Sequence, residues 1–218
     1  MSTMDFLSIE NVFVNIGVYQ MSYLEFIGTL LYLMSVFLIS IRNIWTWPIG
    51  IVSVVLYMYL FIQIQLYSDA LEQVWYLLVS IYGWIFWSRE PYAKGSNYSF
   101  SSRRSISKSI VVIFIGGSIL GVLVSKIHIY LPRFFPEPAT YVFVDSFTTS
   151  ASFVAMFLLA KRRIESWIIW ITVDIVAIWL YLAKGVVFLS GLYVLLTLLA
   201  CNGLYNWMRQ SKLEDPFR

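Results

Sequence analysis

Seven long apolar stretches, separated by short polar segments, restrict this chain to one class of fold. We expect a helix over each stretch: Tyr23–Ile41, Trp47–Gln65, Asp69–Trp87, Ser109–Tyr130, Tyr141–Ala160, Ser166–Leu182 and Val187–Met208. Each is close to the roughly 20 residues that a helix needs to cross the hydrocarbon core of a bilayer. With 60% hydrophobic residues and a mean hydropathy of +0.76, the composition lies outside the range of soluble domains. We therefore predict an all-α integral membrane protein with seven transmembrane helices.

The segments between the apolar stretches are short and polar. Residues 1–20 show no basic region followed by a cleavage site, so we predict no signal peptide but an N-terminal interfacial helix over Asp5–Tyr19. Residues 90–108 are predicted to be a hydrophilic cytoplasmic loop, and residues 210–218 a polar tail. Three prolines predict a stiff turn over Leu131–Thr140.

The chain also resembles itself after a shift of 120 residues. The matched pairs are Glu25 with Asp145, Arg42 with Arg162, Trp47 with Trp167, Gly83 with Gly203, Trp87 with Trp207 and Arg89 with Arg209. Residues 21–89 and 141–209 are therefore interpreted as two copies of a three-helix unit. Three helices reverse the direction of the chain, so a linker helix in residues 109–140 is needed to give both copies one orientation.

This pattern predicts a 3+1+3 parallel repeat related by an axis along the membrane normal, an architecture that transporters use. Duplication is also compatible with a stable bundle that transports nothing. Because two facing units enclose a site between them, we favour transport.

Basic residues predict the orientation of the chain in the membrane. Of the 15 Lys and Arg residues, all but Lys126, Arg133 and Lys184 fall on the side of the helices where the chain ends. Loops rich in Lys and Arg stay in the cytoplasm, so we expect the N-terminus outside and the C-terminus inside. The same charges explain the sequence pI near 8.9. Contact with anionic lipid headgroups accounts for them, and no nucleic-acid partner is needed.

The third apolar stretch carries polar residues at helical spacing. Gln73, Tyr76, Ser80 and Gly83 recur at i, i+3, i+7 and i+10, so they share one face of a helix. Polar side chains in lipid are costly unless they face protein or water. We therefore predict that this helix lines a binding site.

Asp174 is the only charged residue expected near the centre of a span. Intramembrane carboxylates are rare and usually face a cavity or a partner. Two interpretations stay open, since Asp174 either binds a ligand or pairs with a hydroxyl or protonated group inside the bundle. Glu25 and Asp145 occupy equivalent helix N-termini, where the helix dipole favours a negative charge, and are interpreted as structural.

Aromatic rings and amides complete the predicted site. Most tryptophans fall near the ends of spans, as is typical of an aromatic belt, whereas three aromatic residues lie deeper. Flat rings beside amides suit a flat heteroaromatic ligand with a hydrogen-bonding sugar or amide. A cationic ring would add a cation–π attraction of about 2 kcal/mol or more when desolvated. The predicted substrate-binding residues are Gln73, Tyr76, Tyr82, Trp84, Trp170, Asp174, Asn202 and Asn206.

Other function classes have little support in the sequence. The single cysteine, Cys201, and the single histidine, His128, exclude an internal disulfide and the usual zinc, haem and thiol–histidine sites. We therefore predict no catalytic residues, no metal and no cofactor. A membrane receptor or scaffold that does not transport stays open as an alternative from another class.

Several motifs resemble those of the PnuC family of vitamin transporters. The leading one is Leu71–Gln73–Tyr76 followed by Tyr82–Gly83–Trp84 and Trp87. Further motifs are WPIG at Trp47–Gly50, ESWIIW at Glu165–Trp170, and Asn202–Gly203 with Trp207. Together they extend over nearly the whole chain.

The resemblance implies a bacterial inner-membrane carrier built from three-helix bundles like those of the SWEET sugar transporters. It implies facilitated diffusion of nicotinamide riboside, an NAD precursor, with a cytoplasmic kinase that traps the vitamin by phosphorylation. The N-terminus would be periplasmic, and the resemblance also suggests a homotrimer.

Two positions depart from the family pattern and leave the vitamin open. The family usually has an asparagine near position 174 and another near position 53, where this chain has Asp174 and Ser53. A carboxylate suits the cationic pyridinium of nicotinamide riboside and equally the thiazolium of thiamine. Thiamine is therefore the first alternative substrate, and riboflavin the second.

Overall fold

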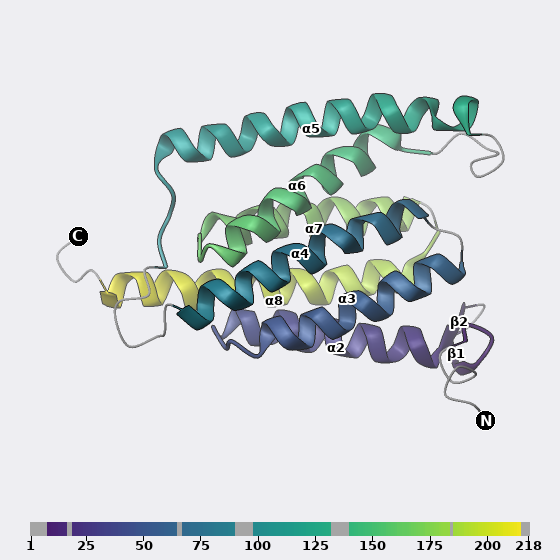
Figure 1. The fold of residues 1–218 in the computed structure, drawn as a ribbon, viewed down its shortest axis with the longest axis horizontal. Coiled ribbons are helices and arrows are strands. Elements are labelled where there is room, and N and C mark those ends of the chain that lie inside the picture. Colours follow the sequence, from purple (N-terminus) through teal and green to yellow (C-terminus); the bar gives the residue numbers. More distant parts are fainter. Residues whose placement is uncertain are drawn as a thin grey trace. The chain divides into compact units, whose positions relative to one another are not determined.

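The computed structural model describes residues 8–16, 19–64, 67–89, 98–131, 140–183 and 185–214. It forms two compact units, Met1–Ser96 and Asn97–Arg218, and each is described by itself. All seven expected helices are present in the described part of the chain (Figure 1). The turn predicted over Leu131–Thr140 falls almost entirely outside the described residues, as do Lys94, Arg133, Lys184 and Arg218 of the charge pattern.

The first unit is a three-helix arrangement preceded by a small hairpin. Its helices are α2 (Tyr23–Ser40), α3 (Thr46–Gln63) and α4 (Tyr67–Arg89). α3 packs against both α2 and α4. Two polar contacts tie α2 to α3 within the apolar packing: Ser53 Oγ donates to the carbonyl of Gly28 at 2.9 Å, and the hydroxyls of Thr29 and Tyr57 lie 2.7 Å apart.

The N-terminal segment is not the interfacial helix that we expected. In the described part of it, β1 (Val12–Ile16) and β2 (Tyr19–Ser22) form an antiparallel pair. The β-branched residues of VFVNI alternate with other residues at the period of a strand, and this outweighs the helical reading. Phe13 stacks on Phe26 of α2 with ring centroids 4.2 Å apart. The hairpin is therefore fixed to the first turns of α2.

The second unit contains four helices: α5 (Arg103–Tyr130), α6 (Val142–Ala160), α7 (Glu165–Ala183) and α8 (Val187–Glu214). Each packs against the next along the chain. Glycines of α5 allow a close approach to α6, because a Cβ atom on Gly117 would lie 2.4 Å from the ring of Phe147, and one on Gly121 2.5 Å from that of Phe143. This is the G-x-x-x-G spacing that membrane helices use for contact.

Two helices of this unit are longer than expected. α5 begins at Arg103 instead of Ser109, because Ser102 caps it by accepting a hydrogen bond from the Ser105 N–H at 3.3 Å. The predicted loop 90–108 is wrong over its last residues. α8 continues beyond Met208 to Glu214, so the predicted tail is also partly helical. Hydropathy indicates where a helix leaves the apolar layer of the membrane. Because α5 and α8 both continue as helix beyond this layer, hydropathy alone predicts both helices to be too short.

The same packing recurs in the two units at positions 120 residues apart. Trp47 and Trp167 are each 1% exposed and lie against the glycines Gly83 and Gly203. The rings of Trp47 and Trp87 meet edge to face at 5.5 Å, and those of Trp167 and Trp207 at 5.4 Å.

The turns before these tryptophans also match. Arg42 and Arg162 both have left-handed backbone, with φ of 65° and 58°. In each turn the following residue donates a backbone hydrogen bond back across the helix end, Asn43 to Leu38 at 2.8 Å and Arg163 to Leu158 at 2.9 Å. This geometry satisfies the last carbonyls of α2 and α6.

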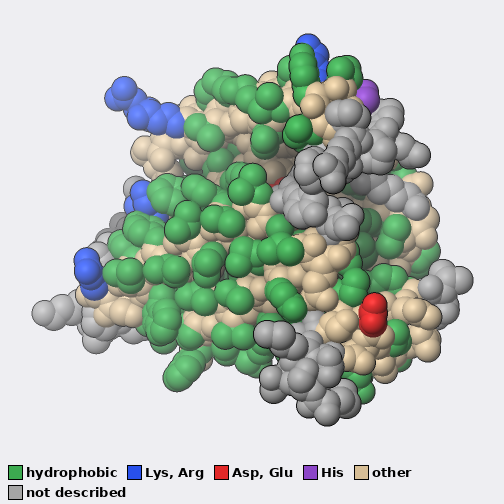
Figure 2. All heavy atoms as spheres, turned by 45° about the vertical axis from the view of Figure 1, so that its right-hand side comes forward, with side chains coloured by type: hydrophobic (Ala, Val, Ile, Leu, Met, Phe, Trp, Pro, Cys, Tyr) green, Lys and Arg blue, Asp and Glu red, His purple; other side chains and the backbone are tan. Residues whose placement is uncertain are grey.

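The helix surfaces suit a lipid environment. Six of the described helices are long and apolar enough to cross a membrane. α4 is not among them, although its 23 residues are sufficient in length. Most of the coloured side chains on the face in Figure 2 are hydrophobic. The chain is therefore a multi-pass membrane protein.

Candidate functional site

The polar stripe of α4 has two different parts. Ser80, Gly83 and Trp87 are buried, and Gly83 lies against the indole of Trp47 in α3. The same face nearer the start of the helix carries Gln73 and Tyr76, which are half-buried. The later part of the stripe is therefore used for packing between α3 and α4. The earlier part is the one available to a ligand.

The two other predicted residues of α4 point in different directions. Trp84 follows Gln73 by 11 positions, which at 100° per residue places it within about 20° of the same face. Tyr82 follows Gln73 by nine positions, about 180° away, and stacks on Phe86 with centroids 5.9 Å apart. Both side chains are exposed, Tyr82 by 38% and Trp84 by 44%. Gln73 and Tyr82 therefore do not line one surface of α4.

Asp174 lies at the centre of α7 and is 3% exposed. Trp170 precedes it by one helical turn and shares its face. Among the described residues, no hydrogen bond or ion pair to Asp174 is found. An ionised carboxylate without a partner is costly to bury, so this position is unusual for a residue that only packs.

The amides of α8 lie beside its packing face. Asn202 and Asn206 are one turn apart and share a face; Asn202 is exposed and Asn206 half-buried. Gly203 and Trp207, each the next residue along, are buried, and Gly203 meets Trp167 of α7. Since α7 and α8 pack together, the second unit brings Trp170, Asp174 and the two asparagines onto one helix pair.

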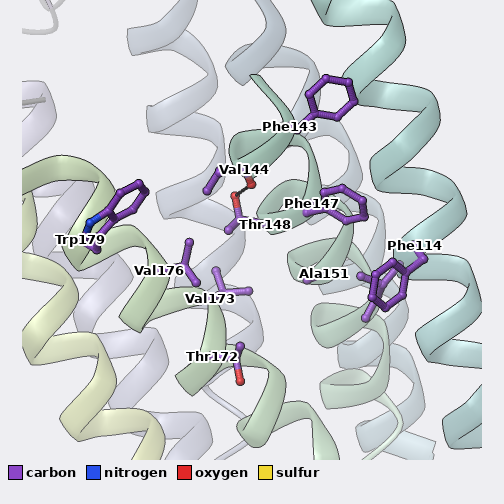
Figure 3. A pocket seen from close by; sticks show the side chains of 11 residues that line it. Phe114, Phe143, Val144, Phe147, Thr148, Ala151, Thr172, Val173, Val176 and Trp179 are labelled. Atoms are coloured by element: carbon purple, nitrogen blue, oxygen red, sulfur yellow. Dashed lines mark hydrogen bonds between the residues drawn. The ribbon is translucent and has the colours of Figure 1, made fainter. Parts of the chain in front are cut away.

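A cavity of about 560 Å³ in the second unit is not this site. Figure 3 shows it between the aromatic rings of α5 and α6 and the side chains of α7. The hydroxyls in its wall are occupied, since Thr148 donates to the carbonyl of Asp145 at 2.8 Å and Thr172 to that of Ile168 at 2.9 Å. None of the predicted site residues lines the cavity. Its wall suits a hydrocarbon rather than a polar vitamin.

Two features of the structure escaped the sequence analysis. Ser53, noted only as a departure from the family pattern, is 1% exposed and ties α3 to α2. Residues 98–101, placed in the loop, form a short segment that docks on the second unit, and we call it the strap. The buried tyrosine Tyr98, in an otherwise polar stretch, was the available signal for the strap.

No group of three or more His, Cys, Asp or Glu that could hold a metal occurs in the described ranges.

Comparison with known proteins agrees with the resemblance seen in the motifs. Residues 22–209 match the nicotinamide mononucleotide transporter family. The chain is 29% identical over 232 residues to the nicotinamide riboside transporters PnuC of Escherichia coli and Shigella flexneri, covering 96% of each protein. It is 28% identical to the riboflavin/roseoflavin transporter RibM of Streptomyces davaonensis, covering 88% of this chain and 87% of that one.

The fold is also similar to a solved structure. Against the crystal structure of the vitamin B3 transporter PnuC the TM-score is 0.68 at 22% identity, covering 88% of this chain and 83% of the other. The match of the family model to residues 22–209 confirms the family suggested by the motifs at Gln73–Trp87 and Glu165–Trp170. The chain belongs to the nicotinamide mononucleotide transporter family, which includes the PnuC transporters.

Proposed function

We propose that this protein takes up nicotinamide riboside across the bacterial inner membrane by facilitated diffusion. Support comes from the two relatives named as nicotinamide riboside transporters, which align with 96% of the chain. Without a membrane potential, uptake by a uniporter stops when the vitamin has the same concentration on both sides. A cytoplasmic kinase that phosphorylates the vitamin makes uptake directional, because the product, which carries an added anionic phosphate, is no longer a substrate.

The vitamin binds to Asp174 and its neighbours. The single observation that carries this proposal is the buried carboxylate of Asp174, which has no partner among the described residues and lies one turn from Trp170. A cationic pyridinium supplies the missing opposite charge, and an indole face adds a cation–π contact. Asn202 and Asn206 bind the ribose hydroxyls or the carboxamide. Gln73, Tyr76, Trp84 and, as a weaker candidate, Tyr82 contribute from α4.

The chain consists of two copies of a three-helix unit joined by α5, in a 3+1+3 arrangement. The matched contacts of Trp47 with Gly83 and of Trp167 with Gly203 support the duplication. The basic residues support a periplasmic N-terminus and a cytoplasmic C-terminus. A homotrimer is part of the same proposal and rests on the resemblance to the family.

Thiamine is the second candidate substrate, and Asp174 is the observation that favours it. The thiazolium ring of thiamine carries the same positive charge as the pyridinium of nicotinamide riboside. Thiamine has no ribose. Riboflavin is the third candidate, because RibM aligns with 88% of the chain, but its neutral ring makes no use of a carboxylate.

The deciding experiment measures uptake into proteoliposomes that contain only this protein. Radiolabelled nicotinamide riboside, thiamine and riboflavin are offered in parallel, with protein-free liposomes as control. We expect saturable entry of nicotinamide riboside down its gradient, inhibited by the unlabelled vitamin. Entry of thiamine alone would reassign the substrate. Tight binding without entry of any vitamin would identify a receptor instead of a transporter.

A further inference from the structure

The strap inserts an aromatic ring into the end of the second unit. Tyr98 is 1% exposed, and its ring meets the ring of Trp207 edge to face at a centroid distance of 4.6 Å. The guanidinium carbon of Arg162 lies 5.9 Å from the centre of the Tyr98 ring. A buried aromatic pair of this kind stabilises the folded protein by more than the burial of its surface area alone. Tyr98 is therefore a packed part of the helix bundle, although it belongs to a segment without helical structure.

Hydrogen bonds fix the rest of the strap to the turn between α6 and α7. The carbonyl of Ser99 accepts from the Ile164 N–H at 3.2 Å, and the Ser99 hydroxyl accepts from Arg163 Nη1 at 2.6 Å. Both carboxylate oxygens of Glu165 accept from the Ser101 N–H, at 3.2 and 3.3 Å. These bonds hold the backbone directly after Tyr98, so the ring has a fixed position relative to the start of α7.

Trp207 is consequently held from two sides. Trp167 of α7 meets it at 5.4 Å with an interplanar angle of 89°, and Tyr98 meets it at 4.6 Å with an angle of 63°. Rotation of α8 about its axis changes both contacts at once. Asn206 directly precedes Trp207, and Asn202 lies one turn earlier on the same face. The contacts of Trp167 and Tyr98 with Trp207 therefore also fix the direction in which the two amides point.

We propose that Tyr98 is a positioning residue for substrate binding, which acts through Trp207 to set the rotation of α8 and thus the aim of Asn202 and Asn206. The inference rests on the proposed function, in which these amides bind the vitamin. With a helix radius of about 5–6 Å, a rotation of about 20° moves a side-chain tip by roughly 2 Å. Hydrogen bonds do not survive such a displacement.

The test is a double-mutant cycle on the purified full-length protein, read by calorimetric binding of nicotinamide riboside, thiamine and riboflavin. Tyr98→Leu removes the ring but keeps an apolar side chain, and Tyr98→Phe is the matched control that keeps the ring. Each change is made alone and together with Asn206→Ala. Thermal unfolding without ligand is recorded for every variant. Glu165→Ala removes the hydrogen bonds to the Ser101 N–H and leaves the rings of Tyr98 and Trp207 unchanged. This variant replaces Tyr98→Leu in the test if Tyr98→Leu does not fold.

We expect Tyr98→Leu to weaken binding of the substrate roughly tenfold, and Tyr98→Phe to bind like the wild type. In the Asn206→Ala background, Tyr98→Leu should have little further effect, because the amide that it positions is already absent. The inference would be overturned if the losses of binding free energy in Tyr98→Leu and Asn206→Ala were additive in the double variant. An unchanged affinity in Tyr98→Leu, or a loss of affinity in Tyr98→Phe as large as in Tyr98→Leu, would also overturn it. If Asn206→Ala binds normally, the proposed site on α8 fails together with the inference. Binding of no vitamin by the wild type refutes the proposed function as well.

Discussion

Gly83 lies so close to the indole of Trp47 that a Cβ atom at this position would sit 2.5 Å from the ring. Gly203 has the same relationship to Trp167, also at 2.5 Å. Both rings are buried, and each also meets edge to face a second tryptophan, which follows the glycine by one turn of the same helix. Neither ring can move away from a larger side chain without disturbing the rest of its unit.

Gly83→Ala and Gly203→Ala should each destabilise the protein. Forcing a methyl group into a filled contact costs about 1–3 kcal/mol, which outweighs the better helix propensity of alanine. Thermal unfolding in detergent measures the change. Gly191→Ala in α8 is the matched control, since nothing lies within 4 Å of its added Cβ, and it should be neutral or slightly stabilising. Equal midpoint temperatures of unfolding for all three variants would contradict the prediction.

Replacing Gln73 or Trp84 by alanine should weaken binding of the vitamin and leave the protein folded. Loss of a hydrogen bond to a neutral group costs about 0.5–1.5 kcal/mol, and loss of a stacking ring somewhat more. Calorimetric titration of each purified variant provides the affinities. Tyr82→Ala tests the opposite face of α4. A larger loss in Tyr82→Ala than in Gln73→Ala would place the ligand on that face.

Asp174→Asn should separate cationic from neutral ligands. Opposite charges about 4 Å apart attract by about 4 kcal/mol at an effective dielectric of 20, and desolvation of the carboxylate offsets part of this. We expect the variant to bind a cationic vitamin roughly tenfold more weakly, and a neutral analogue of the same shape with unchanged affinity. Equal losses for both ligands, or a lower unfolding temperature without ligand, would assign Asp174 a structural role.

Transport should not depend on a proton or sodium gradient. Asp174 is the one carboxylate found at the centre of a described span, whereas Glu165 begins α7 and is bonded to Ser101. A relay needs a second titratable group within reach. With the membrane potential held at zero, uptake into proteoliposomes should therefore reach the external concentration and no more, with or without an imposed ion gradient. Accumulation above that level under a gradient would demonstrate coupling.

The hairpin should detach from α2 only at strongly alkaline pH. The Tyr19 hydroxyl donates to a carboxylate oxygen of Glu25, and burial, followed by this hydrogen bond, raises the pKa of Tyr19 above its usual value. The unfolded chain then loses its proton first, so this contribution to stability is complete below a pH of about 10 and declines above it. Between a pH of about 10 and about 12, the wild type should therefore lose more stability than the Tyr19→Phe variant. Identical pH profiles would exclude the contact.

Helices could be predicted from the sequence because their apolar surfaces face lipid along their whole length. The spans ending at Ile41 and Ala160 were placed within one or two residues, since polar turns with arginines follow directly. The start of α5 and the end of α8 were not predicted, because both helices extend into polar sequence. Arg103 and Glu214 lie in helix that continues past the apolar layer, where capping and length, rather than hydropathy, decide the boundary.

The docking of the N-terminal segment and of the strap could not be predicted, because both segments are held by contacts distant in sequence. The Ile9 N–H is bonded to the side chain of Gln63, 54 residues away. Ser99 is bonded to Arg163, 64 residues away. Of the predicted binding residues, spacing placed Gln73 and Tyr76 on a common face. It did not reveal that Gly83 belongs to a packing contact, because a glycine in sequence does not show which ring lies over it.

The strap also determines the order in which the second unit can be completed during synthesis. Tyr98 leaves the ribosome long before Trp207, the ring on which it packs, and before the turn at Arg163 that holds its backbone. α2, α3 and α4 pack against helices next to them in the chain, whereas the ring of Tyr98 cannot pack on Trp207 until α8 has been translated. Docking of Tyr98 is thus a closing step of folding, and a chain arrested within α8 would present this ring unburied.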